Sequence, residues 1–201
     1  MNMLLDALPK MVEVGGVACK IRTDFRISIM FELMMTDPEV TDEEKLPLAL
    51  NLYYEEFPED IPGAVEAMMW FYKCGRQENA YTKKMQDKQA EKEKKIYSFD
   101  YDDHYIYAAF LQQYGMDLNR VKGLHWWKFR ALFDGLTDAC EFVKIMGYRA
   151  IDITNDMSSG EKKFYRKMKK IYEIPLSQSE QDKQDAIEDA LMNGGDISAL
   201  L

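Results

Sequence analysis

The sequence lacks the features of a membrane or exported protein. It contains no apolar run long enough to cross a bilayer, which takes about 20 residues. Its first ten residues, MNMLLDALPK, hold no basic segment ahead of an apolar one and no small-residue cleavage site, so we expect no signal peptide. The three cysteines are widely spaced and form no C-x-x-C pair, which favours reduced, buried thiols. We therefore expect a protein that works in the cytoplasm.

Motifs of catalysis and metal binding are also missing. There is no G-x-S-x-G, no P-loop and no G-x-G-x-x-G. Asp102, Asp103 and His104 are adjacent, but neighbouring residues of a helix point in different directions and make a poor metal-ligand set. The spacing of Cys140 and His125 does not indicate a nucleophile and its base. We therefore expect a non-enzymatic protein with no cofactor and no metal.

The composition has no excess of basic residues. The formal net charge is -9, which argues against a primary role in binding nucleic acid, because that role needs a basic face. The 201 residues are 47% hydrophobic and 30% charged, as in folded globular proteins. This length allows one sizeable core or two modest ones.

Residues 10–21, KMVEVGGVACKI, predict a β-hairpin. Two short runs of β-favouring residues flank Gly15-Gly16, a dipeptide that tolerates the positive φ of a tight turn. An isolated hairpin is only marginally stable in water, so we expect it to pack against a helix.

Three helices are expected after this hairpin. The first is capped by Thr23 or Asp24 and ends at Asp37-Pro38. The second starts at a capping box in the segment 41–44, although Pro47 inside it should kink the helix or delay its start. The third covers residues 61–75, with a proline near its first position.

A change of composition divides the chain. Lysine, glutamate, glutamine and aspartate dominate residues 77–96, which predicts a solvated linker between two helical units. The mixed signs of its charges argue against a nucleic-acid-binding arm. We thus expect a mostly α-helical protein with four parts: a hairpin and helices in 1–76, the linker 77–96, an aromatic-rich helical unit in 97–175, and an acidic helix or tail in 176–201.

The segment 97–147 is the densest in aromatic residues. Its first helix should end at Gly115, its second carries Trp126, Phe129, Phe133 and Leu136 on one face, and a third begins near Asp138 and stops at Gly147. Aromatic residues bury the most area, so this block is either the centre of the core or a hydrophobic docking groove. On the docking interpretation, exposed Trp126, Trp127 and Phe129 would contact a partner.

Residues 161–172, EKKFYRKMKKIY, predict a basic amphipathic helix. Phe164, Met168 and Ile171 share one face, and the basic residues lie mostly elsewhere. Such a helix can meet a membrane, an acidic partner or phosphates, whereas an ordinary surface helix would only turn its lysines toward water. The acid-rich segment 37–66 is a possible intramolecular partner. The candidate partner-binding residues of this helix are Lys163, Arg166, Lys167 and Lys170.

Several of these blocks resemble one protein family. The sequences YSFDYDDHYIYAAFLQQYGMDL, LHWWKFRALFDGL, FVKIMGYRAIDI and KKFYRKMKKIYEIP look like the bacteriophage "gp fifteen" family of tailed phages and prophages of Gram-positive hosts. The resemblance extends to the N-terminal hairpin and to WFYKCG, and so covers nearly the whole chain. It is least informative from Leu176 onward.

The resemblance implies a role in building a phage tail. Members are encoded beside the tape-measure gene, where the tail assembly chaperones of long-tailed phages sit. Such chaperones act in the host bacterial cytoplasm, keep the helical tape-measure protein soluble and help to recruit tail-tube protein. The family defines no catalytic residues and implies no membrane partner, and it leaves a homo-oligomer open. Two alternatives remain: a structural component retained in the tail, and a nucleic-acid-associated protein using the helix 161–172.

Overall fold

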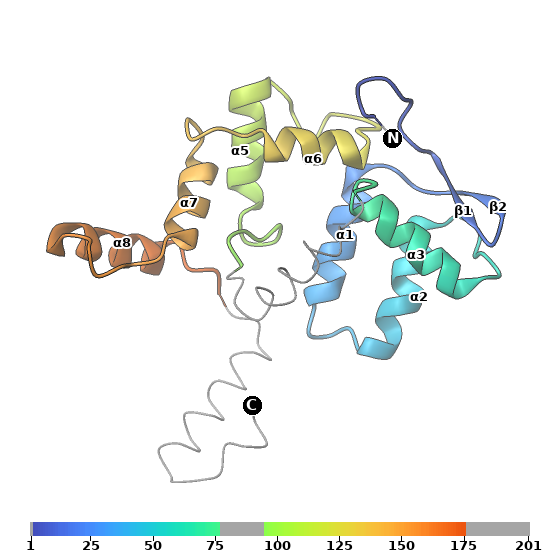
Figure 1. Ribbon diagram of the computed structural model, residues 1–201, viewed down its shortest axis with the longest axis horizontal. Coiled ribbons are helices and arrows are strands. Elements are labelled where there is room, and N and C mark those ends of the chain that lie inside the picture. The colour runs from blue at the N-terminus through green and yellow to red at the C-terminus, as the bar shows by residue number, and fades with distance from the viewer. Residues whose placement is uncertain (1, 77–94, 176–201) are drawn as a thin grey trace, which may run out of the picture.

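The computed structural model describes residues 2–76 and 95–175 (Figure 1). Within these ranges the chain forms seven helices and one two-stranded antiparallel hairpin, so the expected mostly α-helical fold is confirmed. The linker expected at 77–96 lies almost wholly outside the described residues, as does the acidic segment 176–201.

The hairpin forms where the sequence predicts it. Strand β1 (Met11–Val14) pairs with β2 (Val17–Lys20), and Gly15 and Gly16 make the turn with φ of 56° and 79°. Alternate residues of β1, Val12 and Val14, are buried, and this strand packs against helix α3. The helix supplies the cover that an isolated hairpin needs.

Three helices follow, with the predicted caps. They are α1 (Phe25–Thr36), α2 (Asp42–Tyr53) and α3 (Ile61–Tyr72). The side chain of Asp24 accepts a hydrogen bond from the amide of Arg26, and Thr41 forms the capping box with Glu44. Helix α2 begins at Asp42, directly after its N-cap Thr41, so Pro47 does not delay its start.

Four helices lie beyond the charged segment: α5 (Asp103–Tyr114), α6 (Trp126–Asp134), α7 (Glu141–Ala150) and α8 (Ser159–Ile171). Gly115 ends α5 in the left-handed conformation, as predicted. The expected stop at Gly147 is wrong, because α7 continues through it to Ala150, and the N-cap of α7 is Cys140. The contacts of Arg149, described below, hold the last turn of α7 in place and outweigh the low helix propensity of glycine.

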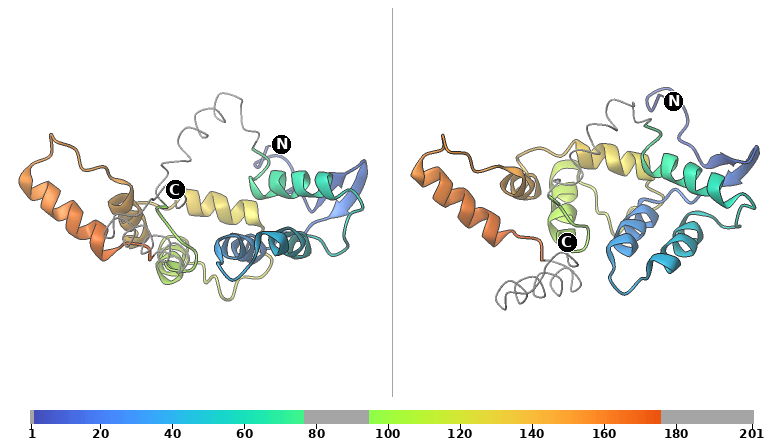
Figure 2. Two further views of the ribbon diagram at one scale, coloured as in Figure 1. Left: turned by 90° about the horizontal axis from the view of Figure 1, so that it is seen from below. Right: turned by 60° about the horizontal axis from the view of Figure 1, so that its bottom comes forward.

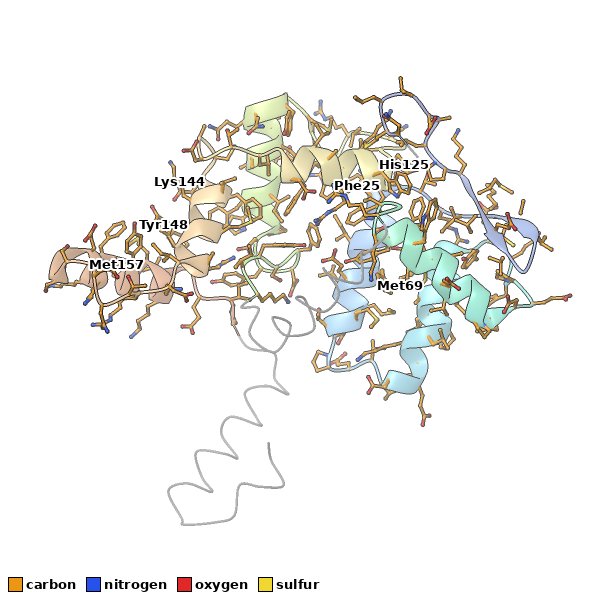
Figure 3. The ribbon with its side chains drawn as sticks, in the orientation of Figure 1. Phe25, Met69, His125, Lys144, Tyr148 and Met157 are labelled. Carbon is orange, nitrogen blue, oxygen red and sulfur yellow. The ribbon has the colours of Figure 1, made fainter. Side chains whose placement is uncertain are left out.

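Residues from both sides of the charged segment share one core. The ring of Phe25 on α1 stacks on that of Phe129 on α6, with centroids 4.7 Å apart and planes 16° apart. Phe129 in turn stacks on Phe110 at 5.0 Å and on Trp126 at 5.7 Å. Figure 3 shows Phe25 and His125 close together where α1 and α6 meet. The aromatic block is therefore the centre of the core.

The expectation that Trp126, Trp127 and Phe129 are exposed is wrong. Their exposed fractions are 1%, 3% and 0%. Each indole N–H also has an internal acceptor at the end of α3: that of Trp126 donates to the Tyr72 carbonyl at 2.8 Å, and that of Trp127 to the Phe71 carbonyl at 2.7 Å. These side chains are buried and their polar groups are hydrogen-bonded, so they connect α6 to α3 across the two halves of the chain.

The elements spread along one long axis. Helix α8 lies at one end, and the hairpin with α2 and α3 lies at the other (Figure 1). Both further views show the same separation (Figure 2). Helices α5, α6 and α7 fill the space between α8 and the N-terminal helices.

Candidate functional site

Helix α8 packs on its neighbour α7 along one edge. Phe164 and Tyr172 contact Tyr148 of α7, with ring centroids 6.0 Å and 5.9 Å apart, and Figure 3 shows Tyr148 on α7 beside α8. The ammonium of Lys169 donates to the backbone carbonyl of Arg149 at 2.7 Å. Even so, no residue of this thirteen-residue helix is buried. Most of its surface is therefore free of contact with the described parts of the chain.

The four predicted basic residues of α8 share one exposed face. Lys163, Arg166, Lys167 and Lys170 follow the spacing i, i+3, i+4, i+7, which aligns them along one side of a helix. All four are exposed, and none has a hydrogen-bond or ion-pair partner among the described residues. Their charges are thus available to an external anion or acidic surface.

An apolar edge runs beside this basic face. The exposed fractions of Phe164 and Ile171 are 47% and 51%, which is high for large apolar side chains. Ile171 lies one turn from Lys167, so apolar and cationic groups adjoin. We call the following six residues the α8 surface: Lys163, Phe164, Arg166, Lys167, Lys170 and Ile171.

Local hydrogen bonds cap the start of α8, and contacts with α7 hold its end. At its start, Ser158 and Glu161 form a capping box, and the hydrogen bonds from Ser158 lower the pKa of the Glu161 carboxyl. At its end, the guanidinium of Arg149 donates to the carbonyl of Tyr172, and the Tyr172 hydroxyl donates to Glu141 at 3.3 Å. These contacts, with the ring contacts of Tyr148, hold α8 against α7.

A cavity of about 300 Å³ lies between α1, α3 and the segment that precedes α5. The carboxylate of Glu32 accepts a hydrogen bond from the Tyr72 hydroxyl at 2.7 Å there, and burial raises the pKa of Glu32. Its walls are mostly apolar and are formed by Phe31, Glu32, Leu33, Met35, Thr36, Met69, Tyr72, Lys95, Tyr97, Ser98 and Phe99. It is a second place where apolar side chains of a partner could insert.

The histidines have separate surroundings. His125 caps α6: its Nδ1 accepts the Trp127 amide at 3.1 Å, and its Nε2 lies 3.0 Å from the Pro9 carbonyl. The second histidine, His104, is exposed beside Asp103. In residues 2–76 and 95–175, no group of three or more histidine, cysteine or acidic side chains is arranged to hold a metal ion.

Sequence reasoning missed the main polar anchor of the structure. Arg149 and Asp102 form a buried ion pair, although 47 residues separate them and no local pattern links them. An arginine beside apolar residues in a helix, and an aspartate at a helix start, each fit ordinary surface positions. The one local signal was that Asp102 occupies the N-cap position of α5.

No helix in the described part of the chain is long and apolar enough to cross a membrane.

Comparison with known proteins identifies the family. The model of the family described as "Bacteriophage Gp15 protein" matches residues 4–174, which include every helix and strand described above. No curated protein and no solved structure matches the chain. The match extends over well more than half of the sequence, and the chain therefore belongs to the bacteriophage Gp15 protein family.

Proposed function

We propose that this phage protein is a non-catalytic tail assembly chaperone that binds the tape-measure protein in the host cytoplasm during tail morphogenesis. The observation that carries the proposal is the α8 surface, an exposed amphipathic face at one end of the molecule. Membership of a bacteriophage family supports the setting. A tail-tube protein is a further candidate partner.

The chemistry of the α8 surface defines the client segment. A segment that packs on Phe164 and Ile171 needs apolar side chains, and one that meets the basic face needs carboxylates beside them. An amphipathic helix with acidic flanks provides both, and helices commonly recognise each other through such paired faces. We propose that a helical segment of this kind in the tape-measure protein docks on α8.

The aromatic core has an indirect role in this proposal. Because Trp126, Trp127 and Phe129 are buried, they position the helices and do not touch a client. Methionine side chains could supply an adaptable surface for a client. Met68 is buried and cannot do so, whereas Met35 and Met69 line the cavity. The cavity is thus the second candidate contact for apolar client side chains.

Co-expression with the tape-measure protein of the same phage tests the proposal. We expect the wild-type protein to co-purify with the tape-measure protein and to increase its soluble fraction. The double variant Lys163→Glu/Lys167→Glu should lose both effects. The matched control is Lys122→Glu/Lys128→Glu, since these lysines are also exposed and have no partner among the described residues. Equal loss in both variants, or no complex with wild type, would contradict the proposal.

The unpartnered cations of α8 also favour a second candidate function, binding of nucleic acid. That function predicts binding to DNA that falls steeply with salt and weakens when the four basic residues are neutralised. A third possibility, a component retained in the tail, predicts the protein in purified virions, from which a chaperone is absent. The DNA assay uses the purified protein and its α8 variants, and the third possibility is tested on purified virions.

A further inference from the structure

Charge is segregated to opposite ends of this molecule. The segment 37–66 contains ten acidic residues and one lysine, a formal charge of -9. Helix α8 contains six basic residues and one glutamate, a formal charge of +5. Figure 1 shows α2 and α3, which belong to the acidic segment, at one end of the long axis and α8 at the other. The acidic segment considered above as an intramolecular partner of α8 therefore does not reach it.

The end of the molecule formed by segment 37–66, here called the acidic end, also presents exposed charges without partners among the described residues. Exposed carboxylates without a hydrogen-bond or ion-pair partner among the described residues are those of Glu39, Glu43, Glu56, Glu59 and Glu66. Large apolar side chains are exposed between them: Leu46 and Leu48 on α2, and Phe57, whose exposed fraction is 56%, in the loop before α3. Apolar groups beside carboxylates match the apolar groups beside cations on α8.

We propose that the acidic end of a second copy of this chain docks on the α8 surface, so that the free protein associates head to tail. The contact joins two different surfaces, so repetition gives a closed ring or an open chain, depending on the rotation between copies. Opposed charges orient the two copies, and burial of Phe164, Ile171 and Phe57 supplies the apolar part of the interface. This inference concerns the protein without a client and stands apart from the chaperone proposal.

The acidic end of a second copy matches the α8 surface better than residues 176–201, the other acidic segment of the chain, do. Residues 176–201 contain six acidic residues and one lysine, a formal charge of -5, and no aromatic residue. The acidic end of a second copy carries the larger formal charge, -9 against -5, and adds the exposed aromatic ring of Phe57.

Sedimentation of the purified full-length protein tests the proposal. Oligomers should dominate at about 0.05 M salt and dissociate at about 1 M, where the Debye length falls to about 3 Å. The variant Lys163→Glu/Arg166→Glu/Lys167→Glu/Lys170→Glu should associate at least about tenfold more weakly, because four ion pairs become repulsive. The Lys122→Glu/Lys128→Glu control should behave as wild type. A wild-type protein that is monomeric at low salt would overturn the inference.

A charge-swap experiment identifies the partner surface. The variant Glu39→Lys/Glu56→Lys/Glu59→Lys/Glu66→Lys should also be monomeric alone, since the formal charge of its segment 37–66 changes from -9 to -1 and no longer attracts α8. Mixed with the α8 charge-reversal variant, it should form a hetero-complex. Circular dichroism of each variant alone checks that both are folded. Absence of a hetero-complex between two folded variants would overturn the proposal.

Neutralising the acidic residues of 176–201 tests whether this segment, and not a second copy, covers the α8 surface. In the full-length variant Asp182→Asn/Asp185→Asn/Glu188→Gln/Asp189→Asn, the proposal expects unchanged self-association. A large gain in association would show that residues 176–201 cover α8 in the wild-type chain and would overturn the second copy as its occupant.

Discussion

Arg149 on α7 forms a buried, two-point ion pair with Asp102 at the start of α5. The Nη1–Oδ2 distance is 2.6 Å and the Nη2–Oδ1 distance is 2.9 Å. The same guanidinium donates to the carbonyls of Ile96 and Tyr172. One side chain thus joins the segment before α5 to the end of α8, and fixes the orientation of the proposed docking helix.

Removing one partner of this pair should be strongly destabilising. In Arg149→Met the carboxylate of Asp102 stays buried without its counter-ion, so we expect a loss of about 3–5 kcal/mol in the free energy of unfolding. Urea denaturation measures it. Arg120→Met is the control, because Arg120 pairs with Asp117 from an exposed position and this pair should contribute less than about 1 kcal/mol. The double variant Arg149→Met/Asp102→Leu should be more stable than Arg149→Met alone; a less stable double variant would contradict this account.

Gly75 should not tolerate a side chain. Its φ is +67°, and a Cβ atom would lie 2.7 Å from the Cη2 atom of Trp127. Gly75→Ala should therefore lower the free energy of unfolding by more than about 1 kcal/mol, through backbone strain and displacement of a buried ring. Gly16→Ala is the matched control, since Gly16 also has a positive φ but has no atom within 4 Å of the added Cβ. Equal thermal shifts for the two variants would refute the steric part of the argument.

The capping role of His125 predicts a loss of stability in acid. Burial lowers the pKa of His125 below its usual 6.5. The unfolded chain then binds the proton more readily, so this contribution is complete above about pH 6.5 and is lost as the pH falls toward the folded pKa. Protonation would also place a hydrogen on Nδ1, the atom that accepts the Trp127 amide.

Thermal unfolding from about pH 8 to about pH 5 measures this effect. His125→Asn keeps a capping oxygen but has no titrating ring, so its melting temperature should fall less over this range than that of wild type. His104→Asn is the control, because His104 is exposed. Parallel curves for wild type and His125→Asn would rule out the role assigned to the ring.

Glu32 is a carboxylate whose removal should stabilise the protein at neutral pH. Burial raises the pKa of Glu32 above its usual 4.5, although the Tyr72 hydroxyl, Arg130 and Lys95 oppose the shift. For a raised pKa, the favourable contribution is present at low pH and is lost as the pH rises through the folded value. Glu32→Gln can still accept from Tyr72, so we expect a gain of about 0.5–2 kcal/mol at pH near 7 that shrinks near pH 4. Urea denaturation at both pH values would reveal a constant difference if the charge were irrelevant.

Local signals in the sequence predict most of the elements. The Gly15-Gly16 turn, the Asp24 cap, the box from Thr41 to Glu44 and the Gly115 stop all act within a few residues, where side-chain chemistry decides the backbone conformation. The failure at Gly147 has the opposite cause, because contacts of Arg149 with distant segments keep α7 helical.

The candidate site is predicted in part. Helical spacing correctly places Lys163, Arg166, Lys167 and Lys170 on one exposed face of α8. The same spacing cannot tell a buried aromatic stripe from an exposed one, which is why the expectation for Trp126 failed. Which face is covered depends on α1 and α3, more than 50 residues earlier, and no local pattern encodes that pairing.

Site-specific photo-crosslinking tests the client-binding role of α8 most directly. A photoreactive phenylalanine analogue replaces Phe164 on α8 or, as the control, Phe57 at the opposite end; both rings are about half exposed. During co-expression with the tape-measure protein, the account predicts a covalent adduct to that protein from position 164 and none from position 57. An adduct from 57 alone, or from neither position while the complex still forms, would contradict it.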